Sequence, residues 1–316
     1  MADVPSDPSV ARLGTARLDS PLETLNPDTL SSFRAVPERS ALASGLGPLN
    51  DLPGRWTGSG FNLIARPDFA QNNDIFLELN LTKETLEFST IGSPIPNRGS
   101  AQADIFLRGV TYLQQISDAK TNGALHIEPG IWIRVPATTA PHGSESVSRL
   151  ACIPHGDAVC AVGSAVTQPG KPTISPVNTV PFPEGASTPG PGAPNSFAEY
   201  NLARPSAFRT APNLLAGITQ DMVTDPTVAL RHDLHNHVIR QTQTLQVTTH
   251  HGGGVSNIPF VTQNANAAFM NATFWIETVQ GPQADFLQLQ YVQTVLLDFL
   301  GLNWPHVSVA TLIKTF

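Results

Sequence analysis

Apolar and polar residues alternate with a period of two along several segments of this chain. Between residues 286 and 299 the alternating apolar set is Leu287, Leu289, Tyr291, Val295, Leu297 and Phe299. This period is typical of a β-strand with one buried face. Similar strand signals occur over 61–65, 75–81, 85–89, 106–116, 125–135, 146–153, 158–166, 238–249 and 267–279, and in a last strand over about 306–314. Pro129 and Gly130 are expected to break segment 125–135 into two strands.

Helical periodicity is weak along the chain. No segment carries a sustained apolar stripe at the spacing of a helix face, and there are no heptads and no short repeats. Many strands and few helices favour an all-β fold. Among all-β folds, we expect an antiparallel β-barrel rather than a sandwich.

Two regions stand apart from the strand pattern. Residues 1–48 are punctuated by Pro and Ser, with one short helix expected around 27–33, and we assign them as an N-terminal extension of a β-barrel domain over 49–316. From residue 167 to about 213 the chain is rich in Pro, Gly, Ser and Asn, and short helical turns are expected near 214–222 and 226–230. Because its prolines exclude this stretch from the middle of a sheet, we assign a Pro/Gly-rich insertion over about 167–225.

The composition is that of a globular chain, because 41% of the 316 residues are hydrophobic and 14% are charged. The net charge is −7 and Lys and Arg do not cluster, which argues against a nucleic-acid partner. We see no secretory signal pattern, and no stretch approaches the ~20 apolar residues that cross a bilayer. We therefore expect a cytoplasmic protein with no membrane partner. Its two cysteines, Cys152 and Cys160, are expected to be small buried side chains.

A glycine-rich motif, Gly54-Arg55-Trp56-Thr57-Gly58-Ser59-Gly60, stands at the start of the first strand segment. Glycine in a strand marks a bend or the close approach of another backbone, and a barrel needs such places. Trp56 could close the narrow end of a barrel. A Gly-rich turn before an ordinary core tryptophan explains the motif equally well. It is no phosphate cradle, because no helix of the required kind follows it.

Three stretches of this chain together resemble one protein family. They are the motif at residues 54–60, the segment Leu125-His126-Ile127-Glu128-Pro129-Gly130-Ile131-Trp132-Ile133-Arg134, and the pair formed by Leu289-Gln290-Tyr291 and His306. They are similar to the signatures of the nitrobindins, which are haem-binding β-barrels of fatty-acid-binding-protein-like, calycin shape. Members of that family are usually much shorter, so the extension and the insertion are additional here.

The resemblance implies a calycin- or lipocalin-like barrel that binds haem b, with His306 as the axial ligand of ferric iron. Small residues on the same strand face, Ser308 and Ala310, would leave room for the macrocycle. The cofactor-binding residues that the resemblance carries over are His306, Trp56, Gly58, Gly60, Ser308 and Ala310. It also implies activity on small reactive ligands: peroxynitrite isomerisation, nitric oxide binding or a peroxidase-like reaction. Without the resemblance, a histidine bonded to a backbone carbonyl at the barrel rim is the simpler interpretation of His306.

His126 and Glu128 are two residues apart, so on a strand they share one face. They form either a distal acid–base pair or a structural polar network with Arg134, and we favour the network. In both cases Arg134 is expected to pair with Glu128. A second histidine-rich segment, 232–237, is expected to be exposed polar chain rather than a metal site.

The alternative function is that of a non-enzymatic carrier, which holds an apolar small molecule such as a fatty acid or terpenoid in the barrel cavity. A carrier would tolerate the loss of His306, whereas a haem protein would lose its iron coordination. A third hypothesis is a cofactor-free enzyme that uses His126 and Glu128. In each case the partner is a small-molecule ligand, and the sequence leaves a homodimer open.

Overall fold

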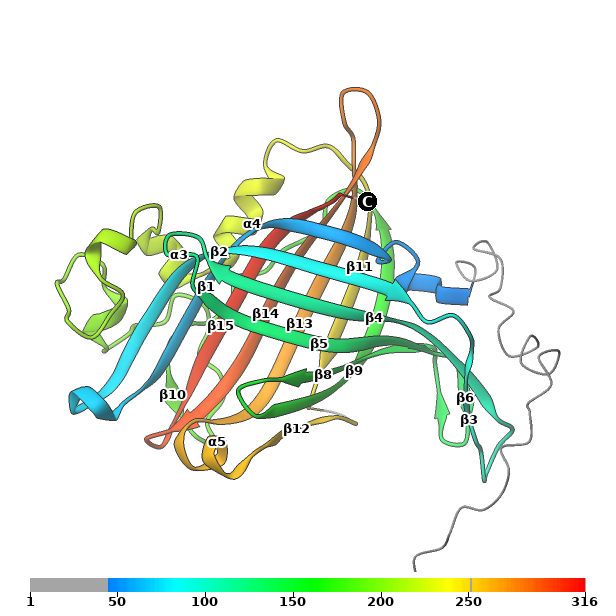
Figure 1. Cartoon of the computed structure of the whole chain (residues 1–316), viewed down its shortest axis with the longest axis horizontal. Coiled ribbons are helices and arrows are strands. Elements are labelled where there is room, and N and C mark those ends of the chain that lie inside the picture. The colour runs from blue at the N-terminus through cyan, green and yellow to red at the C-terminus, as the bar shows by residue number, and fades with distance from the viewer. Residues whose placement is uncertain (1–44, 251, 316) are drawn as a thin grey trace, which may run out of the picture. The chain divides into compact units, whose positions relative to one another are not determined.

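The computed structural model describes residues 45–250 and 252–315. The helix expected around 27–33, and nearly all of the N-terminal extension, lie outside the described residues. Within them, ten long strands close into one antiparallel β-barrel (Figure 1). In the order in which neighbours pair, they are β1 (Gly54–Asp68), β2 (Asn73–Thr90), β4 (Ile105–Asp118), β5 (Ala124–Val135), β8 (Ser146–Ile153), β9 (Asp157–Pro169), β11 (Ile239–Thr248), β13 (Asn266–Val279), β14 (Phe286–Phe299) and β15 (Leu302–Lys314). The expected all-β barrel is confirmed.

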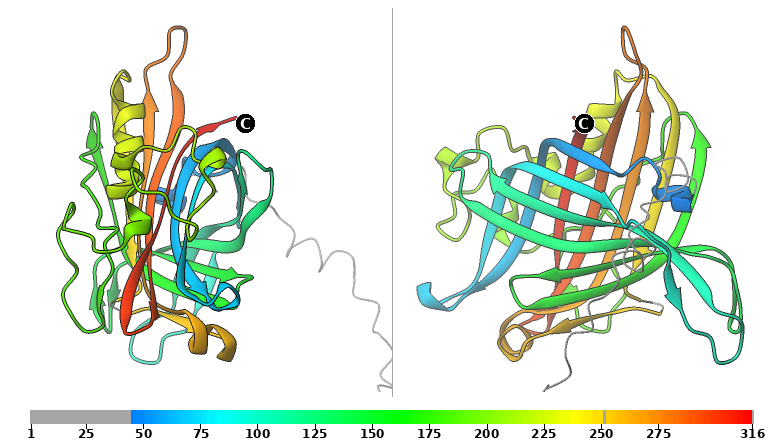
Figure 2. Two further views of the ribbon diagram at one scale, coloured as in Figure 1. Left: turned by 90° about the vertical axis from the view of Figure 1, so that its left-hand side faces the viewer. Right: turned by 45° about the vertical axis from the view of Figure 1, so that its right-hand side comes forward.

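Short elements decorate the barrel. The short strands are β3 (Ile95–Asn97), β6 (Thr138–Thr139), β7 (His142–Gly143), β10 (Phe182–Pro183) and β12 (Gly254–Asn257). The helices are η1 (Gly47–Leu49), η2 (Phe69–Gln71), η3 (Ala198–Tyr200), η4 (Pro212–Leu214), α3 (Gln220–Thr224), α4 (Thr227–Leu234) and α5 (Pro259–Asn264). Figure 2 shows α3 and α4 along the outer wall and α5 across one end of the barrel. The strand pattern did not predict β12 or α5.

The barrel closes where the first long strand pairs with the last. In this seam Gly60 on β1 lies opposite Ala310 on β15. A Cβ atom on Gly60 would lie 2.1 Å from the carbonyl oxygen of Val309. The motif glycines therefore mark a close approach of two backbones, as expected of glycine in a barrel strand.

Alternation along the strands builds two apolar cores. Inward side chains fill one end of the barrel, among them Trp56, Trp132, Phe274, Tyr291 and Leu312. Outward side chains of neighbouring strands, among them Leu63, Leu77 and Val307, pack under the segment between β9 and β11. That segment contributes Tyr200 and Leu230 to this second cluster. The barrel is therefore buried on both faces on this side. The inward side chains beyond the inner core line a cavity.

Two details of the strand prediction are wrong. Residues 75–81 and 85–89 belong to one strand, β2, and β5 runs unbroken through Pro129 and Gly130. Since β5 pairs with β8 only from Gly130 onward, Pro129 has no ladder bond to lose on that side. Gly130 leaves room for the ring of Tyr112, which a Cβ atom would approach to 2.4 Å.

The expectation of buried cysteines is also wrong. Cys152 and Cys160 are both free and exposed. On β9 the buried residues Val159 and Ala161 flank Cys160, so the cysteine points outward.

Candidate functional site

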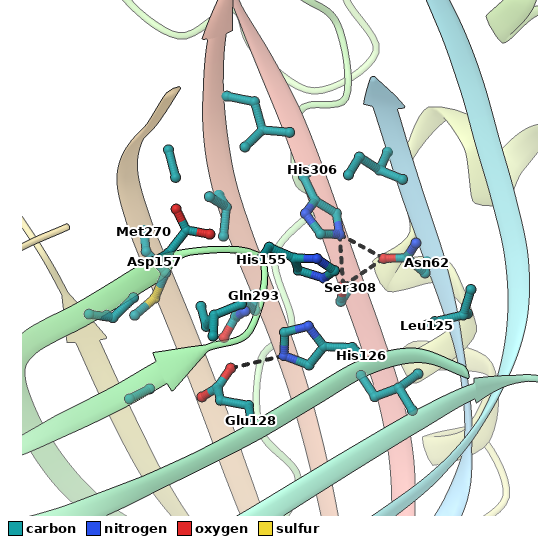
Figure 3. A pocket seen from close by; sticks show the side chains of 18 of the residues that line it. Asn62, Leu125, His126, Glu128, His155, Asp157, Met270, Gln293, His306 and Ser308 are labelled. Atoms are coloured by element: carbon teal, nitrogen blue, oxygen red, sulfur yellow. Dashed lines mark hydrogen bonds and ion pairs between the residues drawn. The ribbon is translucent and has the colours of Figure 1, made fainter. Parts of the chain in front are cut away.

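The barrel encloses a cavity of about 450 Å³ at the end covered by α5. Its wall is formed by inward side chains of the strands, by the turn between β8 and β9, and by α5 itself. Apolar residues that line it include Ile64, Ile116, Leu125, Val159, Met270, Val295 and Leu297. Figure 3 shows the polar side chains that converge on it: Asn62, His126, Glu128, His155, Asp157, Gln293, His306 and Ser308.

His306 lies on the inward face of β15, opposite Val295 of β14. Its Nε2 lies 2.8 Å from Oδ1 of Asn62, which also accepts a hydrogen bond from Oγ of Ser308 at 2.9 Å (Figure 3). The alternation of β15 places Ser308 beside His306 on this face, and the β1–β15 register places Asn62 opposite Ser308. The three side chains form one hydrogen-bonded cluster on the cavity wall.

A chain of amides fixes the direction of these bonds. Asn80 donates from Nδ2 to the carboxylate of Asp118 at 3.0 Å, and Asn62 donates from Nδ2 towards Oδ1 of Asn80 at 3.5 Å. Because a carboxylate only accepts, Oδ1 of Asn62 is the atom turned to His306. Nε2 of His306 therefore carries the hydrogen.

His306 is a neutral imidazole. Burial, followed by the charges of His126 and His155, lowers the pKa of His306 to about 3. A neutral ring suits either a hydrogen-bonding role towards a ligand or coordination of a metal.

Glu128 sits in a tight ion pair with Arg149, both almost fully buried. Nη2 of Arg149 donates to Oε1 of Glu128 at 2.5 Å, and the hydroxyl of Tyr112 donates to the same oxygen. Burial opposes ionisation of Glu128, but Arg149, together with His126 and Tyr112, outweighs it and lowers the pKa of Glu128 to about 2. The other oxygen, Oε2, lies 3.2 Å from Nε2 of His126.

The expected pairing of Arg134 with Glu128 is wrong. Arg134 pairs with Glu145, and the cation beside Glu128 is Arg149. Arg134 and Glu128 share a face of β5, but they stand six residues apart on an extended strand, roughly 20 Å. Arg149 reaches Glu128 because β8 runs alongside β5.

His155, in the turn between β8 and β9, and Asp157, the first residue of β9, both reach the cavity. The rings of His155 and His126 lie 5.8 Å apart. Burial and then the charge of His126 lower the pKa of His155, and burial raises the pKa of Asp157. Three histidines thus face one cavity. Within the described ranges, however, no group of three or more His, Cys, Asp or Glu side chains is placed to hold a metal ion.

The remaining residues expected to bind a cofactor lie away from this cavity. Trp56 is fully buried in the inner core, where Nε1 donates to the carbonyl of Leu52 at 2.8 Å. Gly58 and Gly60 form the seam between β1 and β15, and Ala310 packs in the inner core. Of the six residues carried over by the resemblance, His306 and Ser308 line the cavity.

Five residues of the site were not predicted: Asn62, Arg149, His155, Asp157 and Gln293. For Arg149 the sequence did hold a signal. It alternates with Val147 and Ala151, which are buried, so a lone charge stands on the inward face of β8. The sequence held a similar signal for Asn62, because it follows Gly58 and Gly60 at a spacing of two and so lies on the same inward face of β1.

Comparisons with known proteins found similarity to solved structures but to no family. No family model matches the chain, and no curated protein does. The chain is similar to a solved structure, Rv2717c from M. tuberculosis, at 14% identity and a TM-score of 0.41, covering 87% of this chain and 98% of that one. In the described part of the chain, no helix is long and apolar enough to cross a bilayer.

Proposed function

We propose that this protein binds a neutral, largely apolar small molecule inside its barrel. The observation that supports this is the cavity of about 450 Å³ inside the barrel, which lies within the usual range of small-molecule sites of about 300–1,000 Å³. Its lining combines aliphatic side chains with a few convergent polar groups, which is the pattern of a pocket that selects its ligand.

The charges around the cavity favour a neutral ligand. Two arginines line the cavity, and both are paired: Arg66 with Glu78 at 3.2 Å and Arg149 with Glu128. Each nitrogen of Arg149 donates a hydrogen bond, Nε to the hydroxyl of Tyr112 at 2.9 Å, Nη1 to Gln293 at 2.6 Å, and Nη2 to Glu128. His306 is neutral, and the lowered pKa of His155 favours its neutral form. A carboxylate would therefore enter without a free cation, at the cost of its hydration. This favours a neutral terpenoid-like molecule over an ionised fatty acid.

A pair of matched ligands tests this proposal. The neutral dye N-phenyl-1-naphthylamine reports binding by its fluorescence, and farnesol and farnesoate are added as competitors of similar shape. We expect farnesol to displace the dye at least roughly tenfold more effectively than the carboxylate, because an unpaired buried charge costs more than about 1.4 kcal/mol. Equal displacement by the two competitors would contradict the neutral-ligand proposal.

A variant that fills the cavity locates the binding site. Val295→Trp places a large ring in the cavity wall beside His306, and we expect it to abolish dye binding. Val166→Trp is the matched control, since Val166 is 58% exposed on the outside of β9. Dye binding that survives Val295→Trp would place the ligand elsewhere.

Haem b on His306 is the second candidate. The observation that favours it is the neutral imidazole on the cavity wall, because iron coordination requires the neutral form. The fit is incomplete, since Nε2 of His306 gives its hydrogen to Asn62, and iron on that nitrogen requires this bond to break. We therefore place haem, and with it the chemistry of peroxynitrite, nitric oxide or peroxide, behind the binding of an apolar molecule.

A further inference from the structure

One buried guanidinium orients two groups on the cavity wall. Arg149 is 2% exposed and lies among the rings of Tyr112, Trp132 and Phe274. From this fixed position Nη2 binds Glu128, and Nη1 binds Oε1 of Gln293 at 2.6 Å. Both acceptors line the cavity. Arg149 therefore fixes the orientation of both groups before any ligand enters.

Glu128 in turn sets the tautomer of His126. An ionised carboxylate only accepts hydrogen bonds, so Nε2 of His126, 3.2 Å away, carries the hydrogen. The lone pair is left on Nδ1. Among the described residues Nδ1 has no hydrogen-bond partner, and the side chain is 18% exposed, on the cavity wall. A carboxylate that fixes the orientation and tautomer of a histidine, and leaves its other ring nitrogen open, is the arrangement of a general base.

Gln293 supplies a donor on the same wall. Because Arg149 takes Oε1, the amide group Nε2 is left as a donor of two hydrogens. It forms no hydrogen bond within the described part of the chain, and Figure 3 shows Gln293 beside Glu128 and His126. A fixed donor of this kind can stabilise negative charge that develops on an oxygen.

The cavity offers no activated nucleophile beside this base. The hydroxyl of Ser308 gives its hydrogen to Asn62, and the nearest imidazole nitrogen, Nε2 of His306, already carries one. Cys152 and Cys160 point to the outside of the barrel. The described residues thus combine a base and a donor, which suits proton transfer rather than acyl or glycosyl transfer.

We propose that the cavity catalyses proton transfer at carbon in a neutral, apolar substrate that carries an enolisable carbonyl group. Nδ1 of His126 removes a proton next to the carbonyl, the C–H electron pair forms a C=C bond, and the carbonyl π pair moves to the oxygen. Nε2 of Gln293 donates to that oxygen. The protonated His126 then returns the proton to another carbon as the carbonyl re-forms, so the double bond has moved without net oxidation. This inference rests on the proposed function, because the substrate must enter the cavity.

A neutral aromatic probe tests for the base directly. In 5-nitrobenzisoxazole, removal of the proton on carbon breaks the C–H bond, forms a nitrile, cleaves the N–O bond and leaves a coloured phenolate. Nδ1 of His126 takes the proton and Gln293 donates to the phenolate oxygen. We expect the intact protein to convert the probe, and His126→Ala to lower kcat/KM by about 10²-fold or more. His232→Ala is the control, since the side chain of His232 is 86% exposed outside the cavity.

Chemical rescue separates a catalytic histidine from a structural one. Added imidazole should restore turnover to His126→Ala, because the free base can occupy the space of the missing ring; a purely structural loss would not be rescued. Gln293→Leu should lower kcat about 10-fold or more while KM changes little. Glu128 acts through His126 as a positioning residue, so Glu128→Gln should lower kcat and change the pH profile of the rate.

Dye binding distinguishes failure of this inference from failure of the proposed function. If 5-nitrobenzisoxazole displaces N-phenyl-1-naphthylamine but is converted equally by the intact protein and His126→Ala, the base is overturned and the binding function stands. If neither dye nor probe binds the intact protein, both proposals are overturned. Dye binding by His126→Ala also shows that this variant is folded.

Discussion

Gly58 on β1 lies directly opposite Leu312 on β15, and a Cβ atom on Gly58 would lie 2.0 Å from the carbonyl oxygen of Thr311. No side chain fits at this distance without a shift of backbone. Since β1 and β15 form the seam of the barrel, the shift falls on the contact that closes it. The glycine is thus a condition of closure.

The first prediction concerns this seam. Gly58→Ala should destabilise the protein by about 1–3 kcal/mol, because the added methyl group forces the two backbones apart. The free energy of unfolding is measured by urea denaturation. Gly92→Ala is the matched control, since a Cβ atom there meets nothing within 4 Å. Equal urea midpoints for the two variants would show that the backbone of β15 can move away from residue 58 without lowering the free energy of unfolding.

Because of Glu277, the free energy of unfolding should decrease as pH rises. The side chain is fully buried, and burial raises its pKa to about 8, against the opposing hydrogen bond from Nε2 of Gln288 at 2.7 Å. Between about pH 4.5 and pH 8 the unfolded chain releases a proton that the folded chain keeps. The free energy of unfolding therefore decreases as pH rises through this window, by an amount on the order of a few kcal/mol in total.

The contacts of Glu277 agree with a protonated carboxyl. In the described part of the chain, Oε1 of Glu277 and Oε1 of Gln288 are buried without a hydrogen-bond partner, and a carboxylic acid supplies the hydrogen that one such oxygen needs. Glu277→Gln removes the titration. Urea midpoints from pH 5 to pH 9 should fall more steeply for the parent than for Glu277→Gln. Parallel curves would mean that another group controls this dependence.

The strands were predictable because burial has a period of two. Segment 286–299 coincides with β14, and segment 267–279 begins one residue inside β13. The same period places Cys160 outward between two buried neighbours. The strand pattern therefore indicated an exposed side chain, and the prediction of buried cysteines was wrong because it followed the usual burial of cysteine instead.

Partners across strands were not predictable. The match of Glu128 with Arg149 depends on the register between β5 and β8, which are separated along the chain by β6 and β7. His155 stands in a turn, where alternation says nothing about direction. Asn62 shows its role only once β1 and β15 are paired. The position of His306 on an inward face could be inferred, but the hydrogen bond that occupies its Nε2 could not.

Arg149 should be the most costly cation to remove from the barrel. Arg149→Met leaves the carboxylate of Glu128 buried without its cation, which costs about 3–5 kcal/mol in the free energy of unfolding. Arg149→Met combined with Glu128→Gln should recover part of this loss, because the lone charge is then gone. Urea denaturation measures all three proteins.

A surface pair gives the comparison for Arg149. Arg55 and Glu87 form an ion pair in which the side chains are 44% and 52% exposed, so Arg55→Met should cost about 1 kcal/mol or less. If Arg149→Met were no more destabilising than Arg55→Met, Glu128 would take up a proton or water at little cost. The ion pair would then not hold the cavity wall in place.

The last prediction decides between haem and an apolar ligand at His306. Stoichiometric hemin should give a sharp Soret band only if an imidazole nitrogen binds iron, and that band should be lost or shifted in His306→Ala. Because Nε2 of His306 is held by Asn62 at 2.8 Å, Asn62→Ala should free this nitrogen and strengthen the band. A spectrum equal to that of free hemin in the parent and in Asn62→Ala would exclude His306 as the iron ligand. A band that survives His306→Ala would instead direct attention to His126 and His155, which face the same cavity.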